Sequence, residues 1–156
     1  MPRKQVVLRI LCVAILLGAT LPVLAAAVRN RPFGPYTFRL VGTSTFQGET
    51  FQERDRGTLR LSGLRVKGQT NNGETSFNLK FPNRLNTNNR QTTTAKGRVV
   101  INDEDLGVNT GPLTANVRVQ KTRAGIWKIT ANYSGRATKG RGKGATIAGR
   151  IVAKSS

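Results

Sequence analysis

A basic, glycine-spaced run near the C-terminus contains the side chains best suited to bind an anion. It reads Arg136-Ala-Thr-Lys139-Gly-Arg141-Gly-Lys143-Gly144. Lysine and arginine are usual partners of phosphate and sulfate groups, and glycine leaves neighbouring backbone amides accessible. The run lacks the G-x-x-x-x-G-K-[ST] order of a nucleotide-binding loop. We therefore predict an anion-binding loop of Arg136, Lys139, Arg141 and Lys143; the alternative is a hairpin tip whose charge only keeps the protein in solution.

The one acidic concentration of the chain is Asp103-Glu104-Asp105. Carboxylate oxygens are the ligands that calcium takes, but the following Gly107 and Asn109 do not fit the spacing of an EF-hand loop. Asp103 and Asp105 are therefore weak metal candidates, because a solvated turn with these residues needs no ligand. We expect no bound metal and no other cofactor.

The residues for conventional enzyme chemistry are scarce. The sequence has no histidine, and its one cysteine is Cys12, which removes the usual general base and thiol nucleophile. Two carboxylates that cleave glycosides stand about 5 to 9 Å apart. Nothing in the sequence brings Glu49 or Glu53 next to Asp103 or Asp105. We therefore expect a protein that is not an enzyme.

The first 27 residues have the three parts of a secretory signal peptide. A basic start with Arg3 and Lys4 precedes an apolar block over residues 10–24, and residues 25–27, Ala-Ala-Ala, supply a cleavage site. The block is shorter than the about 20 residues that a membrane-spanning helix needs. We predict cleavage of residues 1–27 and export to the periplasm or the exterior, with no integral membrane segment left. An uncleaved anchor is the alternative.

The charge of the chain is strongly positive, with a formal net charge of +19. The signal peptide holds three basic and no acidic residues, so its removal leaves +16. Such a surplus favours acidic partners or anionic surfaces. For an exported protein these are polysaccharide, lipopolysaccharide or extracellular nucleic acid. The alternative is a charge that serves solubility alone.

Apolar and polar residues alternate along most of the chain after residue 35, for example at Tyr36, Phe38 and Leu40. A period of two predicts half-buried strands, and turn signals such as Asn71-Asn72-Gly73 separate them. We predict eight strands, at about 36–46, 57–61, 64–69, 75–81, 91–101, 113–121, 126–137 and 144–153.

The predicted fold is an all-β, antiparallel meander of about eight strands. Closing the meander into a small closed or partly closed β-barrel removes both exposed edges, and a curled β-sandwich is the alternative. We expect a flexible basic leader over residues 28–35 and a single β-domain over residues 36–156. A barrel of about eight strands is either filled by its own side chains or holds one small ligand.

Three functions fit this organisation. The favoured one is an exported binding module whose basic strand faces and glycine-rich loop engage an anionic polymer or the anionic cell envelope. The second is a carrier of a small apolar ligand inside the barrel, where Phe38, Phe77, Trp127 and Tyr133 would contact it. The third is a structural or assembly factor of the cell envelope.

Overall fold

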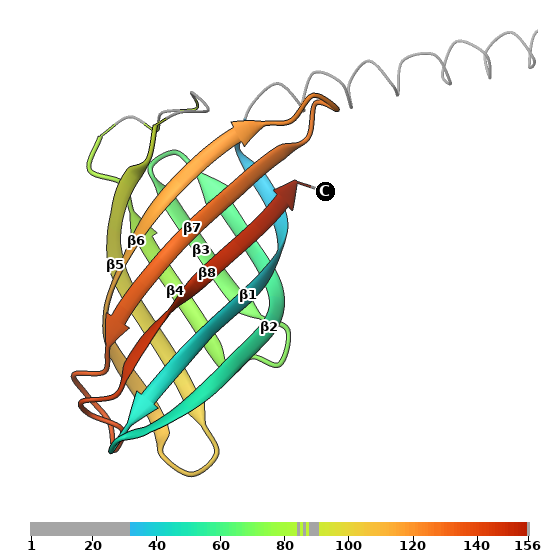
Figure 1. The fold of residues 1–156 in the computed structure, drawn as a ribbon. Coiled ribbons are helices and arrows are strands. Elements are labelled where there is room, and N and C mark those ends of the chain that lie inside the picture. The colour runs from blue at the N-terminus through green and yellow to red at the C-terminus, as the bar shows by residue number, and fades with distance from the viewer. Residues whose placement is uncertain (1–31, 84, 86, 88–90, 156) are drawn as a thin grey trace, which may run out of the picture. The chain divides into compact units, whose positions relative to one another are not determined.

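The alternating segments of the sequence form eight strands that close into an antiparallel barrel (Figure 1). The computed structural model describes residues 32–83, 85, 87 and 91–155. Each strand pairs with its neighbours in chain order, and the first strand pairs with the last. The predicted all-β meander and its closed barrel are confirmed. The strands are β1 (Gly34–Phe46), β2 (Glu49–Ser62), β3 (Arg65–Thr70), β4 (Thr75–Lys80), β5 (Thr93–Asp103), β6 (Gly107–Lys121), β7 (Trp127–Arg136) and β8 (Thr146–Ser155).

The predicted signal peptide, residues 1–27, and residues 28–31 of the predicted leader lie outside the described residues. Within the described part of the chain, no helix is long and apolar enough to cross a membrane.

Large apolar side chains fill one half of the barrel. The largest that are fully buried are Tyr36, Leu61, Phe81 and Val119. These four side chains lie at the start of β1, at the end of β2, just after β4 and near the end of β6. Antiparallel pairing brings these four positions to the same end of the barrel. Burial of each such side chain contributes about 1.5 to 3 kcal/mol. We call this half the packed end; the marked C-terminus lies there, at the top of Figure 1.

The other half, which we call the open end, carries the connections β1–β2, β3–β4, β5–β6 and β7–β8. It is the lower end in Figure 1. Two strands extend further toward it than the sequence pattern predicted. β2 begins at Glu49 rather than at residue 57, and β6 begins at Gly107 rather than at residue 113. Residues 49–56 and 107–112 therefore form part of the barrel wall. The alternation of apolar residues had not predicted a strand in either segment.

The predicted leader also contributes to the wall, because β1 begins at Gly34 rather than at Tyr36. Pro32–Ser156 forms one compact unit. The hydroxyl of Tyr36 donates a hydrogen bond to the carbonyl of Pro32. This bond ties the residues before β1 to the packed end.

Candidate functional site

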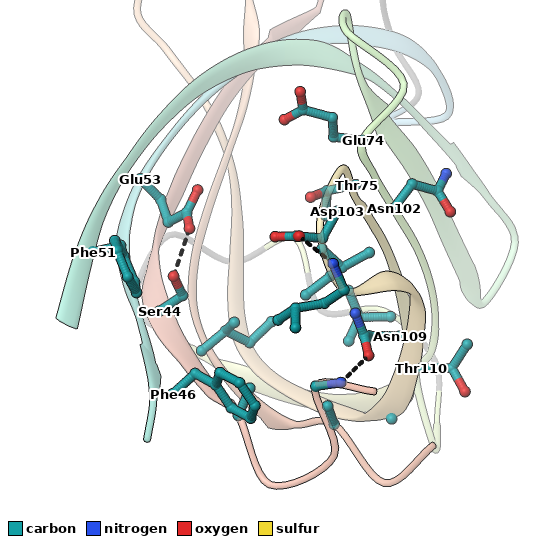
Figure 2. Close-up of a pocket in the computed structure, with 18 of the residues that line it drawn as sticks. Ser44, Phe46, Phe51, Glu53, Glu74, Thr75, Asn102, Asp103, Asn109 and Thr110 are labelled. Carbon is teal, nitrogen blue, oxygen red and sulfur yellow. Dashed lines mark hydrogen bonds between the residues drawn. The ribbon is translucent and has the colours of Figure 1, made fainter. Parts of the chain in front are cut away.

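The open end of the barrel contains a cavity of about 620 Å³. This volume is within the range of about 300 to 1,000 Å³ that is typical of small-molecule sites. The deeper part of the cavity is largely apolar, because most of its buried side chains are hydrocarbon: Leu40, Phe77, Val99, Leu113 and Ile151. Figure 2 shows polar residues from several strands gathered around the opening.

All seven acidic side chains of the protein line this cavity. They come from β2, from the turn after β3, and from the end of β5 with the turn that follows it. Figure 2 shows three of them, from these three parts of the chain, around the opening. Among the residues that the structure describes, no lysine or arginine lines the cavity. The seven are Glu49, Glu53, Asp55, Glu74, Asp103, Glu104 and Asp105.

The carboxylates have few partners within the protein. The hydroxyl of Ser44 donates to Oε1 of Glu53 over 2.7 Å. Oδ1 of Asp103 accepts the backbone amides of Asp105 and Leu106, at 2.9 and 2.8 Å, which holds the turn between β5 and β6. None of the seven forms an ion pair with a lysine or arginine of the described residues. The cavity is therefore a negatively charged hollow in a strongly basic protein.

Tyr133 places a phenol group in the same hollow. The strand register aligns Tyr133, Gly149, Gly42 and Glu53 in one row across β7, β8, β1 and β2. The side chain of Tyr133 is 9% exposed, and its hydroxyl has no hydrogen-bond partner among the described residues. Burial, together with the nearby charges of Glu53 and Asp55, raises the pKa of Tyr133 to about 12. The phenol therefore stays neutral at physiological pH.

The four predicted ligand-contacting aromatic residues separate into two pairs. Phe77 and Tyr133 line the cavity, whereas Phe38 and Trp127 are not among its lining residues. The ring of Phe38 packs beside that of Phe77, with centroids 5.9 Å apart. Trp127 begins β7, six residues before Tyr133, and so lies about 20 Å away along the strand. Its ring faces Nζ of Lys121 at 5.8 Å, so the sole tryptophan reports on the packed end.

The predicted anion-binding loop closes part of the open end of the barrel. Its amides are used within the fold: those of Gly142, Gly144 and Ala145 donate to Oδ1 of Asn109 (2.7 Å), to the carbonyl of Ala137 (2.9 Å) and to the carbonyl of Gly142 (3.0 Å). For these three residues, this corrects the expectation that glycine leaves the amides of the loop accessible. An anion at this loop would therefore contact mainly the exposed basic side chains, which are Arg136, Lys139, Arg141 and Lys143.

Two rows of basic side chains cross the outer face of β2 to β5. Strand pairing sets the members of each row beside one another, except that Asn78 of β4 stands between Lys67 and Arg98, and all six basic residues are exposed. A shallow groove of about 570 Å³ runs over the first row. Like charges that face each other across strands are destabilising. We call these residues the basic face; the first row is Arg60, Lys67 and Arg98, and the second is Arg65, Lys80 and Lys96.

The sequence showed each of these basic residues on the polar side of a strand, but it did not show that they are neighbours. The sequence signal is a set of basic residues at polar positions of β2 to β5, and only the strand register brings them together as a patch. Asp103 and Asp105, the weak metal candidates, lie at the mouth of the cavity. Within the described ranges, no group of three or more His, Cys, Asp or Glu residues is arranged to hold a metal ion.

Comparisons with protein families and with curated proteins found no match to this sequence. A solved structure with some similarity to the chain is the ywiB protein from Bacillus subtilis. Its sequence identity is 11% and its TM-score is 0.28, and the alignment covers 81% of this chain and 94% of that chain.

Proposed function

We propose that this protein is a non-enzymatic binding protein that holds one small ligand in the open half of its barrel. The observation that carries the proposal is the cavity of about 620 Å³ with an apolar interior and an open mouth. An apolar hollow with a few convergent polar groups is the usual form of a small-molecule site. We also propose that the protein acts outside the cytoplasm, in keeping with the predicted signal peptide.

Small residues support this proposal, since they keep the open half hollow. Gly111, Ala137, Gly142 and Ala145 are among the residues that line the cavity. An eight-stranded barrel is narrow enough for its own side chains to fill it, as they do at the packed end. A ligand would replace the side-chain volume that these positions lack.

A neutral fluorescent probe tests the proposal. We expect N-phenyl-1-naphthylamine, whose emission rises in apolar surroundings, to bind the purified protein saturably. Ile101 is half-buried and lines the cavity, so Ile101→Trp fills part of it and should abolish probe binding. Ile126 is 42% exposed and lies in the β6–β7 connection, outside the cavity, so Ile126→Trp should bind the probe normally. A folded protein that binds no probe, or an Ile101→Trp variant that binds it as the wild type does, would contradict the proposal.

A second candidate function is binding of an anionic polymer, and the basic face is the observation that favours it. Six exposed cations in two adjacent rows form a surface that can neutralise successive charges of a polyanion. The same surface serves the polysaccharide, lipopolysaccharide or nucleic acid partners expected from the charge. This function and ligand binding in the barrel use different parts of the molecule.

Two variants with equal charge change separate a site from general attraction. One replaces three cations of the basic face, Arg60→Gln/Lys67→Gln/Arg98→Gln. The matched variant replaces three cations of the glycine-rich loop, Lys139→Gln/Arg141→Gln/Lys143→Gln. In titrations with labelled dextran sulfate at stepped salt, we expect the first variant to lose more affinity and more salt dependence than the second. Equal losses would indicate attraction by net charge alone.

A further inference from the structure

We infer that the ligand of the cavity is an organic cation, with one ammonium group on an apolar body. This inference rests on the proposed function and names the class of ligand for the same site. Four observations carry it: the distribution of charge, the depth of two carboxylates, an unpartnered phenol, and the apolar wall that faces them.

The distribution of charge is the first observation. The chain has 26 basic and 7 acidic residues, and every acidic residue lines the cavity while no described lysine or arginine does. Acidic residues on the outer wall would relieve repulsion among the exposed cations. Five of the seven are exposed at the rim and two lie further in, so the acidic charge is concentrated at the open end of the barrel. A cationic ligand is the partner that this negative hollow selects.

Two of the carboxylates lie within the wall rather than at the rim. In the register of β1 and β2, Glu53 pairs with Gly42, and Asp55 pairs with Leu40 one inward position deeper. Both acidic residues are only partly exposed, and Leu40 is buried. Removing a carboxylate from water costs free energy unless a cation or a donor replaces the water. An ammonium group at this depth would supply up to three such donors.

The phenol of Tyr133 is independent of the acidic residues and points to the same ligand. Its side chain is nine-tenths buried and lines the cavity, and its hydroxyl has no partner among the described residues. Since no buried side-chain oxygen or nitrogen of the described residues lacks a hydrogen-bond partner, this unpartnered hydroxyl is accessible from the cavity. The hydroxyl lies in the same row as Glu53. It therefore offers a neutral oxygen to an N–H donor bound beside that carboxylate.

The wall that faces β2 suits an apolar body. In a barrel of eight strands in chain order, β6 lies opposite β2. Leu113 of β6 and its neighbours Val99 and Phe77 line this side of the cavity. Phe51, which is 53% exposed, stands at the mouth, where an aromatic face attracts an organic cation. The ammonium group thus lies against β2 and the body against β4 to β6.

The same geometry disfavours other ligands. A fatty acid would place its carboxylate among seven like charges with no described cation in the cavity to pair with it. A neutral apolar molecule would leave Asp55 beside hydrocarbon without a donor, and Glu53 with the Ser44 hydroxyl as its donor.

Three compounds with the same chain and different head groups test the inference: decylamine, decanol and decanoate. Each is used to displace N-phenyl-1-naphthylamine at neutral pH, below the concentration at which it aggregates. We expect decylamine to bind at least about tenfold more tightly than either of the others, since a hydrogen bond to a charged group contributes more than a neutral one. Glu53→Gln/Asp55→Asn should remove this preference and leave decanol binding unchanged.

The matched control changes the net charge equally on the outer face of the same strand. Gln52 and Thr58 are exposed on β2, so Gln52→Lys/Thr58→Lys adds two positive charges without touching the cavity. It should keep the preference for decylamine. Circular dichroism verifies that each variant folds. If Glu53→Gln/Asp55→Asn does not fold, the single variant Glu53→Gln replaces it in the test.

The outcomes separate this inference from the proposed function. If the three compounds displace the probe equally, the inference is overturned and binding in the barrel stands. It is likewise overturned if decylamine is preferred but the cavity and control variants bind it alike, because the amine then binds elsewhere. If neither the probe nor any compound binds the folded protein, the proposed function fails and the inference fails with it.

Discussion

The hydroxyl of Tyr133 lies against the backbone of Gly42, two strands away on the inner wall of the barrel. A β-carbon added at Gly149, the residue between them, would come within 2.6 Å of this hydroxyl, and one at Gly42 would come closer still. Glycine at both positions lets the ring of Tyr133 lie along the wall. Its hydroxyl is thereby held in the same row as Glu53.

Gly42→Ala should destabilise the protein by about 1 to 3 kcal/mol, because the new methyl group meets both the Tyr133 hydroxyl and the carbonyl of Ala148. Adding Tyr133→Phe should recover part of this loss. Chemical denaturation measures both. Thr37→Ala, at an exposed position of the same strand, should change stability by no more than about 0.5 kcal/mol. A Gly42→Ala variant as stable as the wild type would refute the close approach.

Tyr133→Phe should weaken decylamine binding by about tenfold and leave the free energy of unfolding nearly unchanged, because the hydroxyl has no hydrogen-bond partner among the described residues to lose. Tyr36→Phe is the matched control. It removes a hydrogen bond to Pro32 and should cost about 1 kcal/mol of stability without affecting the ligand. Equal decylamine affinity in the two variants would place the phenol outside the site.

Tyr36 and Tyr133 are the two tyrosines of the chain, and burial raises the pKa of each from 10.0 to about 12, with Glu53 and Asp55 adding to the shift at Tyr133. The unfolded chain ionises first, so the stability from these groups is complete below pH 10 and is lost between pH 10 and 12. Each tyrosine should contribute about 2 to 3 kcal/mol to this loss. Ultraviolet titration of tyrosinate, compared with the protein in denaturant, measures the shift. Coincident titration curves would refute it.

Asn109→Ala should cost about 1 to 3 kcal/mol, since it leaves the amide of Gly142 without its acceptor in a buried site. The side-chain amide of Asn109 also donates to the carbonyl of Gly107, which joins the two loops. We expect faster hydrogen exchange at Gly142 in this variant. Asn132→Ala, at an exposed position on β7, should leave both stability and exchange unchanged. Unaltered exchange in Asn109→Ala would show that this bond does not hold the loop.

Lys67→Glu should stabilise the barrel by about 0.2 to 1 kcal/mol at low salt, because Lys67 faces Arg60 directly across β2 and β3. The same change should weaken the binding of dextran sulfate if the basic face is a site. Arg123→Glu makes an equal charge change in the exposed β6–β7 connection. It should stabilise the barrel less than Lys67→Glu does, and it should weaken dextran sulfate binding less. Identical binding losses in the two variants would remove the basic face as a distinct site.

The pattern of apolar residues predicted strands where the barrel is packed and missed them where it is hollow. Leu59 and Leu61 alternate with polar residues because they face the packed half, so that part of β2 was predicted correctly. Further along the same strand the inward residues include Glu53 and Asp55, which face the cavity. Hydrophobic alternation reports a dry interior, and it is absent where strand residues line a polar hollow.

Sequence alone determined that the chain is an all-β meander, that it is strongly basic, and that it has few residues for conventional catalysis. Only the tertiary structure decided that Glu53, Glu74 and Asp103, which are far apart in the chain, line one cavity, and that Arg60, Lys67 and Arg98 form one row. The physical reason is that each neighbour relation depends on the register of long-range strand pairs and on closure of the barrel. Alternation along the chain assigns a residue to a face of its own strand, but it does not say which residue of the next strand lies beside it.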